Sequence, residues 1–517
     1  MLLVVALGAG VFVYLQRGPD LAAAGCAGSL TVTVAVAPEI ADPVRSAARA
    51  LEHDGAAVGG SCVDFDVQPQ APAPVAQAVA AASEARPDLW VPDSSVWLGR
   101  VENAPTPPEV LTDSLARTPV VLAGPGVDKP FSWLEVLSRD DVSLIDPLSS
   151  SAPASALLAA HAESARTGAS EDQIAAAMLP LAQRMGSEGA ARTVDDLAAD
   201  GFRGAAVLSE QQVVALRADG LAGDFDVTVP GTGTLVLDYP LVATSDDPAV
   251  LEAAALVESY LSGPDGAETL ELAGFRGADL APLPDSGGAG QVPVLDVPSA
   301  ELADTVLRQW AVLTVPSRSL AVFDVSGSMD FIEAGQPRID LAVEAATRAL
   351  QLFPDHAQIG VWGFSIGLGG GTRDYRELVP VRPLAQPVGG GTQRKALASA
   401  LAGLPELTAG GTGLYDTTLA AVRTVQDGYD LRAANSVVLL TDGENEDPGS
   451  LSLKELLGAL ERERDPARPV RVIAIGMGPE ADARALQRIA AATGGRSYVA
   501  RDSADITVVF RDALLSR

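Results

Sequence analysis

Short apolar runs alternate with longer Ala- and Leu-rich stretches in the first part of the chain. The pattern predicts strands at residues 30–38, 63–69 and 88–91, separated by helices at 42–53 and 75–84. Strands that alternate with helices predict a parallel sheet, because a parallel pair needs a helix-length crossover. Ligands of such sheets bind beyond the carboxyl ends of the strands. We therefore expect the Pro38-Glu39 turn and the Asp93-Ser94-Ser95 turn to lie on one rim.

A second cycle of the same kind begins near Arg117. It contains predicted strands at 118–125, 143–147 and 205–208, an extended segment at 227–244, and helices at 154–164, 249–261 and 267–273. Two α/β lobes joined by crossing extended strands resemble periplasmic-type, bacterial extracellular solute-binding proteins, as do the pieces LWVPDSSVW, IDPLSSSAPASALLAA and LDYPLVAT. The resemblance implies a two-lobe α/β domain at 26–290, with a cleft for a small molecule.

Hydroxyl groups gather at the predicted strand ends of this region. In a cleft, hydrogen bonds to a small-molecule ligand would come from Ser94, Ser95, Ser149, Ser150, Ser151 and Tyr239. The alternative is that serines after strands are ordinary turn and helix-cap residues, which bond free backbone amides. The sequence leaves both interpretations open.

A Gly- and Pro-rich stretch at 282–298 leads to a helix-like segment, and we assign residues 291–315 to a linker and connecting helix. Beyond them, strands are predicted at 319–325, 358–364, 436–440, 470–476 and 496–500, and helices at 339–352, 414–426, 453–463, 482–492 and 506–515. The first helix has Ile339, Val343, Ala346 and Leu350 at the spacing of a buried stripe. The pattern predicts a doubly wound, Rossmann-like α/β domain with a parallel sheet at 316–517.

The strand at 319–325 runs into the sequence Asp324-Val325-Ser326-Gly327-Ser328. One carboxylate and two hydroxyls on alternate loop residues present three oxygens on one side, which a hard cation such as Mg²⁺ prefers. Gly327 permits the tight turn between them. This D-x-S-x-S loop resembles the metal-ion-dependent adhesion site of von Willebrand factor type A domains. Taken alone, the same motif also fits a capped helix start.

The resemblance implies two further metal ligands. Asp442 follows the strand at 436–440, and Thr412 stands on a glycine-rich loop before the helix at 414–426. The family has its second aspartate, which often acts through a water, and its threonine at these points. Thr372 and Thr392 also follow glycine runs, and the local pattern alone does not exclude Thr392. The expected set around Mg²⁺, with Mn²⁺ or Ca²⁺ as alternatives, is Asp324, Ser326, Ser328, Thr412 and Asp442.

Acidic residues outnumber basic ones, with 67 Asp+Glu against 36 Lys+Arg in 517 residues and a net charge of −31. This charge argues against nucleic-acid binding, which needs clustered Lys and Arg. It argues equally against polybasic binding to a membrane surface. Glu444, Glu446 and Asp447 either shape the field near the metal, bind a second cation, or form a solvated acidic loop.

The first fifteen residues form an apolar run, short of the roughly 20 needed to cross a bilayer. We expect residues 1–25 to be a signal anchor or transmembrane segment, with a buried strand or helix as the alternative. Cys26 ends a string that faintly resembles a lipoprotein processing site. A Cys26–Cys62 disulfide fits an exported protein better, because each cysteine precedes a predicted strand.

No P-loop lysine motif, G-x-S-x-G elbow or H-E-x-x-H motif is present, so we expect a binding protein rather than an enzyme. The resemblance implies that an acidic residue of a protein partner fills an open position on the metal. We expect an extracytoplasmic protein, membrane-anchored at the bacterial surface or secreted. The alternative is a solute receptor of a membrane transport system, with the type A domain as an accessory.

Overall fold

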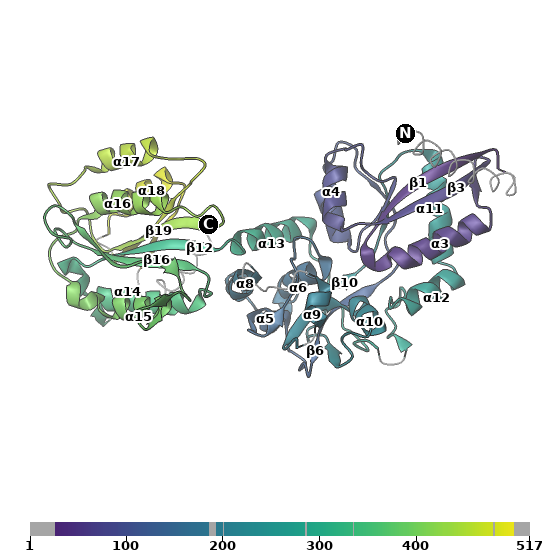
Figure 1. The fold of residues 1–517 in the computed structure, drawn as a ribbon, viewed down its shortest axis with the longest axis horizontal. Helices are drawn as coiled ribbons and strands as arrows, with labels where there is room; N and C mark the ends of the chain where they lie inside the picture. The colour runs from purple at the N-terminus through teal and green to yellow at the C-terminus, as the bar shows by residue number, and fades with distance from the viewer. Residues whose placement is uncertain are drawn as a thin grey trace, which may run out of the picture. The chain divides into compact units, whose positions relative to one another are not determined.

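The computed structural model describes residues 26–185, 193–199, 201–284, 287–333, 335–478 and 481–500. Contacts divide the chain into two compact units. The first unit takes in residues up to 174 together with 190–308, and the second takes in 175–189 together with the residues from 309 onward. Figure 1 shows both units as mixed α/β structures.

The first unit contains two lobes, each with its own sheet. The sheet of the first lobe has the strand order β2-β3-β1-β4-β11-β5. Its strands are β1 (Gly28–Val36), β2 (Ala57–Val58), β3 (Ser61–Pro69), β4 (Leu89–Val91), β5 (Glu109–Thr112) and β11 (Leu241–Ala243). Its helices are α3 (Ala41–His53), α4 (Pro72–Ala80), α11 (Pro248–Leu261) and α12 (Pro264–Leu272). The parallel pairing of β1 with β3 and β4 confirms the sequence-based expectation.

The sheet of the second lobe has the order β10-β6-β8-β7, and β9 also pairs with β6. Its strands are β6 (Thr118–Pro125), β7 (Val142–Ser143), β8 (Ala205–Ser209), β9 (Phe225–Thr228) and β10 (Val236–Leu237). Its helices are α5 (Trp133–Ser138), α6 (Ser151–Ala162), α7 (Ser164–Thr167), α9 (Val194–Ala198) and α10 (Glu210–Ala218). Helix α8 (Glu171–Met185) begins in the first unit, and its residues from Ala175 onward are counted with the second unit. The expected extended segment at 227–244 is broken into β9, β10 and β11, because Pro230, Gly231 and Gly233 interrupt it, and it passes from one sheet to the other.

The second unit has a six-stranded sheet in the order β16-β15-β12-β19-β20-β21. Its strands are β12 (Ser317–Asp324), β15 (Gln358–Phe364), β16 (Tyr375–Pro383), β19 (Ala434–Thr441), β20 (Arg471–Met477) and β21 (Ser497–Ala500). Strand β16 lies antiparallel at one edge, while β15, β12, β19, β20 and β21 run parallel. The sequence pattern did not predict β16, because its charged and partly exposed residues lack the apolar run of a central strand.

Helices cover both faces of this sheet (Figure 1). One core contains residues of α14 (Arg338–Leu352) and α15 (Gln393–Ala402), and the other contains residues of α16 (Leu414–Asp427), α17 (Leu453–Arg462) and α18 (Ala483–Ala492). Helix α13 (Ala300–Leu313) precedes the sheet in sequence. The doubly wound arrangement confirms the expected fold class. The helix expected at 506–515 lies outside the described residues.

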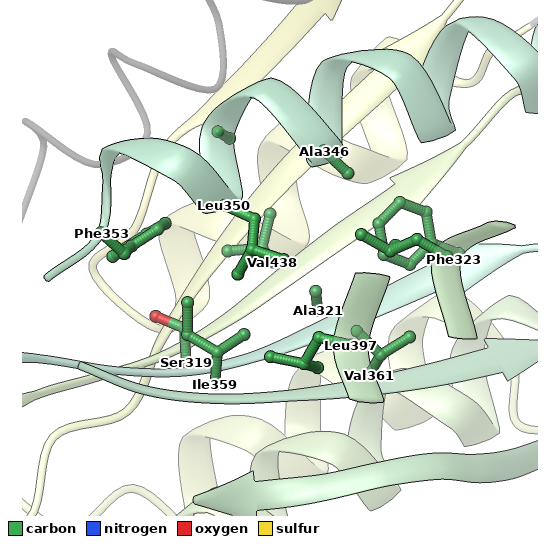
Figure 2. Close-up of a pocket in the computed structure, with 12 residues that line it drawn as sticks. Ser319, Ala321, Phe323, Ala346, Leu350, Phe353, Ile359, Val361, Leu397 and Val438 are labelled. Carbon is green, nitrogen blue, oxygen red and sulfur yellow. The ribbon is translucent and has the colours of Figure 1, made fainter. Parts of the chain in front are cut away.

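A small apolar cavity of about 60 Å³ lies between the sheet and helices α14 and α15 (Figure 2). Ala346 and Leu350, which belong to the predicted stripe of α14, face it together with Phe323 from the sheet. The polar residue in its lining, Ser319, bonds through its hydroxyl to that of Ser436 at 2.8 Å. The cavity is thus part of the core, and it offers no ligand set for a cation.

The expected disulfide joins Cys26 to Cys62, across a sequence separation of 36 residues. Cys62 lies near the start of β3, where Gly28 and Ser29 of β1 pair with Ser61 and Cys62. In the described part of the chain, no helix combines the length and apolarity that a bilayer span requires. The anchor expected at 1–25 falls outside that part.

Candidate functional site

The predicted metal ligands of the second unit stand at the carboxyl ends of two neighbouring central strands. Phe323 of β12 pairs with Leu440 of β19, so Asp324 emerges beside Thr441 and Asp442. Ser326 and Ser328 follow on the first loop, which continues into the 3₁₀ turn η4 (Gly327–Asp330). Adjacent parallel strands therefore deliver two carboxylates and two hydroxyls to one rim.

The carboxylate of Asp324 is buried and is held by two neutral donors. The Ser326 amide donates to Oδ1 at 2.8 Å, and the Thr441 hydroxyl donates to Oδ2 at 2.5 Å. Burial raises the pKa of Asp324 to about 7, and the nearby charge of Asp442 adds to the rise. A bound cation would stabilise the ionised carboxylate of Asp324 and so offset the free-energy cost of burying its charge.

The two serines connect Asp324 to Asp442. The hydroxyls of Ser326 and Ser328 lie 3.0 Å apart, and the Ser328 hydroxyl donates to Asp442 Oδ1 at 2.7 Å. The Arg338 guanidinium, at the start of α14, donates to Asp442 Oδ2 at 2.9 Å and to Glu333 at 2.8 Å. The sequence analysis did not single out Arg338, because nothing in its local pattern indicates a partner about a hundred residues away.

Thr412 lies on a second loop that is bonded to the first. The Gly327 amide donates to the Gly410 carbonyl at 2.9 Å. A Cβ atom on Gly443 would lie 3.3 Å from the Thr412 hydroxyl oxygen, so Thr412 reaches the turn that contains Asp442. Of the rival threonines, Thr372 is exposed, and the exposed Thr392 caps α15 by accepting a hydrogen bond from the Lys395 amide.

Two carboxylates and three hydroxyls thus converge on one rim, and this donor set fits a hard divalent cation. Four of the five side chains, those of Asp324, Ser326, Thr412 and Asp442, belong to residues that are 0–1% exposed. The sequence analysis did not anticipate an arginine in this site. Arg338 forms an ion pair with Asp442 and so offsets part of its charge. The arrangement leaves Asp324 as the strongest anionic ligand for a cation.

A second polar cluster lies in the first unit, between its two lobes. Asp93, which follows β4, accepts hydrogen bonds on Oδ1 from the Ser151 hydroxyl at 2.7 Å and from the Trp97 indole at 2.9 Å. Gln212 of the second lobe donates to Glu39 of the first at 3.0 Å. Burial raises the pKa values of both carboxyl groups, that of Asp93 to about 7, and the charge of Glu39 contributes to the rise at Asp93.

The structure separates the six hydroxyl residues expected to bind a ligand. Ser151 joins the cluster of Asp93. Burial raises the pKa of Tyr239, and the nearby charges of Glu39, Asp93 and Asp238 add to the rise. The Ser94 hydroxyl accepts a bond from the Val96 amide, and Ser149 donates to the Asp146 carbonyl. Ser95 contributes its backbone amide to Asp238, and the Ser150 side chain makes no cap bond.

The carboxylates of this cluster were not among the expected ligands. Glu39 and Asp93 belong to the two turns that were expected to lie on one rim. That shared placement was the feature of the sequence from which their role in the cluster could have been predicted. Tyr239 has a φ of 43°, a left-handed conformation that is uncommon for a residue with a side chain. Its hydroxyl has no hydrogen-bond partner among the described residues. A buried donor of this kind is available to a ligand.

Two regions of the chain match known protein families. Residues 32–276 match the family of bacterial extracellular solute-binding proteins, and residues 320–512 match the von Willebrand factor type A domain. An uncharacterized protein of Mycobacterium tuberculosis is 27% identical over 551 residues, which cover 95% of this chain and 78% of that protein. The chain therefore combines a solute-binding-like domain with a type A domain.

Solved structures with related folds match smaller parts of the chain. A von Willebrand factor type A protein from Catenulispora acidiphila is 25% identical with a TM-score of 0.30, over 39% of this chain and 42% of that one. The sulfate-binding protein SubI from Mycobacterium tuberculosis is 20% identical with a TM-score of 0.38, over 49% and 88%. A periplasmic thiamin binding protein is 13% identical with a TM-score of 0.39, over 55% and 96%.

Raising the pH from about 5 to about 8 is expected to lower the thermal stability of the solute-binding-like domain. The folded-state pKa of Asp93 is about 7, above the roughly 3.9 of an unfolded aspartate, so the folded domain retains this proton to higher pH. The stability gained from that proton is lost as the pH rises through about 7. The measurement is calorimetric unfolding across this range.

The Asp93→Asn variant, which stays neutral and keeps an oxygen acceptor for Ser151 and Trp97, should show a flatter pH dependence. Asp42→Asn is the matched control, because Asp42 is an exposed carboxylate on the same lobe. An Asp93→Asn variant with the pH dependence of the wild type would contradict this prediction.

Proposed function

We propose that this chain is an extracytoplasmic binding protein that engages a protein partner through a divalent cation in its type A domain. The proposed ligands are Asp324, Ser326, Ser328, Thr412 and Asp442, around Mg²⁺ with Mn²⁺ or Ca²⁺ as alternatives. The proposal rests chiefly on Asp324, a fully buried carboxylate that is held by neutral donors on the rim where the other four side chains also lie. A bound cation would supply the positive charge that attracts an acidic side chain of the partner.

The chain's own residues would orient these ligands. Thr441 and Ser326 hold the two oxygens of Asp324, and Ser328 and Arg338 hold those of Asp442. With both carboxylates oriented beforehand, binding a cation would cost little conformational entropy. Because Arg338 offsets the charge of Asp442, the rim would keep enough positive charge to attract an acidic partner.

The proposed location is the outer face of the bacterial membrane, either anchored through residues 1–25 or secreted. The disulfide between Cys26 and Cys62 supports an oxidising compartment outside the cytoplasm. The solute-binding-like match at residues 32–276 supports the same assignment. A binding role, rather than catalysis, agrees with both families.

Asp324→Ala should abolish Mg²⁺ binding to the type A domain, measured by isothermal titration calorimetry of the full chain. The variant removes one of the two buried carboxylates of the set, and the other, Asp442, is already paired with Arg338, so the remaining oxygens cannot replace the lost charge. Asp330→Ala is the matched control, because Asp330 is an exposed carboxylate on the same loop. Equal loss in both variants, or unchanged affinity in Asp324→Ala, would rule out the proposed ligand set.

The partner's contribution can be tested with short peptides in the presence of Mn²⁺. A peptide with a single glutamate should lower the Mn²⁺-dependent enhancement of water proton relaxation, because its carboxylate displaces water from the open position. The matched glutamine peptide should have no such effect, and neither peptide should act on Asp324→Ala. Equal effects of the two peptides would contradict an acidic partner.

A second candidate function is a solute receptor of a membrane transport system, with the type A domain as an accessory. Glu39, Asp93 and Tyr239 favour it, because a half-buried and a buried carboxyl group with raised pKa values and a free buried hydroxyl form a polar site between the lobes. The side chains that donate to these carboxyl groups are neutral. This chemistry suits a positively charged solute.

A small diamine such as putrescine should raise the unfolding temperature of the full chain at pH 8, whereas inorganic sulfate should not. Asp93→Asn should reduce the effect, because it removes one of the charges that attract the amine. Asp42→Asn again serves as the control. A shift with sulfate and none with the diamine would contradict a cationic solute.

A further inference from the structure

Three carboxylates outside the proposed adhesion site lie close together near the Thr412 loop. They belong to Asp374, Asp416 and Asp447, and one oxygen of each lies within 4.8 Å of the other two. Asp374 precedes β16, Asp416 lies in the first turn of α16, and Asp447 stands on the loop after β19. Three segments distant in sequence therefore contribute one acid each.

Asp374 is the buried member of this triad. It is 4% exposed, and its Oδ1 accepts a hydrogen bond from the Gly367 amide at 2.8 Å. Its Oδ2 is buried and has no hydrogen-bond partner among the described residues. A Cβ atom on Gly413 would lie 2.5 Å from that oxygen, so the glycine lets the backbone pass close to the carboxylate.

The other two acids are also fixed by the backbone. Asp416 Oδ1 accepts a bond from the Leu451 amide at 3.0 Å, and Asp447 Oδ1 accepts one from the Gly449 amide at 2.8 Å. Each of the three carboxylates thus uses one oxygen to fix its position. Burial raises the pKa of Asp374, and the charges of Asp447 and Asp416 add to the rise, as expected for carboxylates that lie close together.

We propose that Asp374, Asp416 and Asp447 form a second divalent-cation site, selective for Ca²⁺. Ca²⁺ lies about 2.3–2.6 Å from its oxygen ligands, so ligand atoms on opposite sides of it are roughly 4.6–5.2 Å apart. Three oxygens within 4.8 Å of one another therefore suit a common Ca²⁺. Carboxylates from three separate segments also suit the irregular coordination of Ca²⁺ better than the octahedron that Mg²⁺ requires.

The second site would fix Thr412 from both sides. Gly413, next to Thr412, packs against Asp374. Glu446, next to Asp447, accepts a bond from the Thr412 amide at 3.1 Å and donates its own amide to the Thr412 carbonyl at 2.8 Å. Ca²⁺ at the triad would thus order the loop that supplies one ligand of the proposed adhesion site.

Asp324→Ala provides the background for the test, because it removes the proposed adhesion site and leaves the triad intact. Calorimetric titration of this full-length variant with CaCl₂ should show one site with a Kd of about 0.1–1 mM. Adding Asp374→Asn or Asp416→Asn should weaken it about tenfold or more, because cation affinity depends on the number of charged ligands. Both asparagines keep an oxygen for the backbone amides.

Hydrogen–deuterium exchange supplies an independent measurement. Ca²⁺ should slow exchange at residues 410–413 in Asp324→Ala and leave it unchanged when Asp374→Asn is added. Asp427→Asn is the matched control, because Asp427 is an exposed acid on the same helix as Asp416. Absence of Ca²⁺ binding to Asp324→Ala, or equal binding after Asp374→Asn, would overturn the proposal. Mg²⁺ binding as tight as that of Ca²⁺ would overturn the assignment to Ca²⁺.

Discussion

The hydrogen bond between Thr441 and Asp324 ties the two central strands of the type A domain together at the point where both end. A buried carboxylate is costly unless donors surround it. Here the donors come from the neighbouring strand and from the loop that begins at the carboxylate itself. The register between β12 and β19 therefore places Asp324 beside Thr441 and Asp442 on one rim.

Local sequence patterns predicted the parts of this rim that follow directly from strands. Asp324 and Asp442 each come just after an apolar run, and parallel strands end on the same side. The choice between Thr412 and Thr392 could not be made from such patterns, because both follow glycines and precede helices. What separates them is long-range contact, with Thr412 facing Gly443 and Thr392 capping its own helix. The positions of Arg338 and Asp374 near other acidic residues also arise from long-range contacts, so local sequence patterns could not reveal them.

In the solute-binding-like domain, local sequence patterns predicted the strands and helices better than they predicted the polar cluster. Its strands and helices follow the sequence pattern closely, whereas its polar cluster joins two of the expected residues, Ser151 and Tyr239, to carboxyl groups that were not expected. Two of the serines have their hydroxyls bonded to nearby backbone, as cap and turn residues do. Glu39 and Asp93 come together because segments from both lobes converge on them, and no short motif encodes that meeting.

The disulfide between Cys26 and Cys62 also determines how the protein would transmit mechanical force. Tension applied to the chain before Cys26 and after Cys62 would pass through the sulfur bridge and bypass the intervening residues. Those residues include all of β1 and α3, the strand at the heart of the first sheet and the helix that follows it. A pull along the chain would thus load β3 directly, while the covalently closed loop would be shielded from stretching.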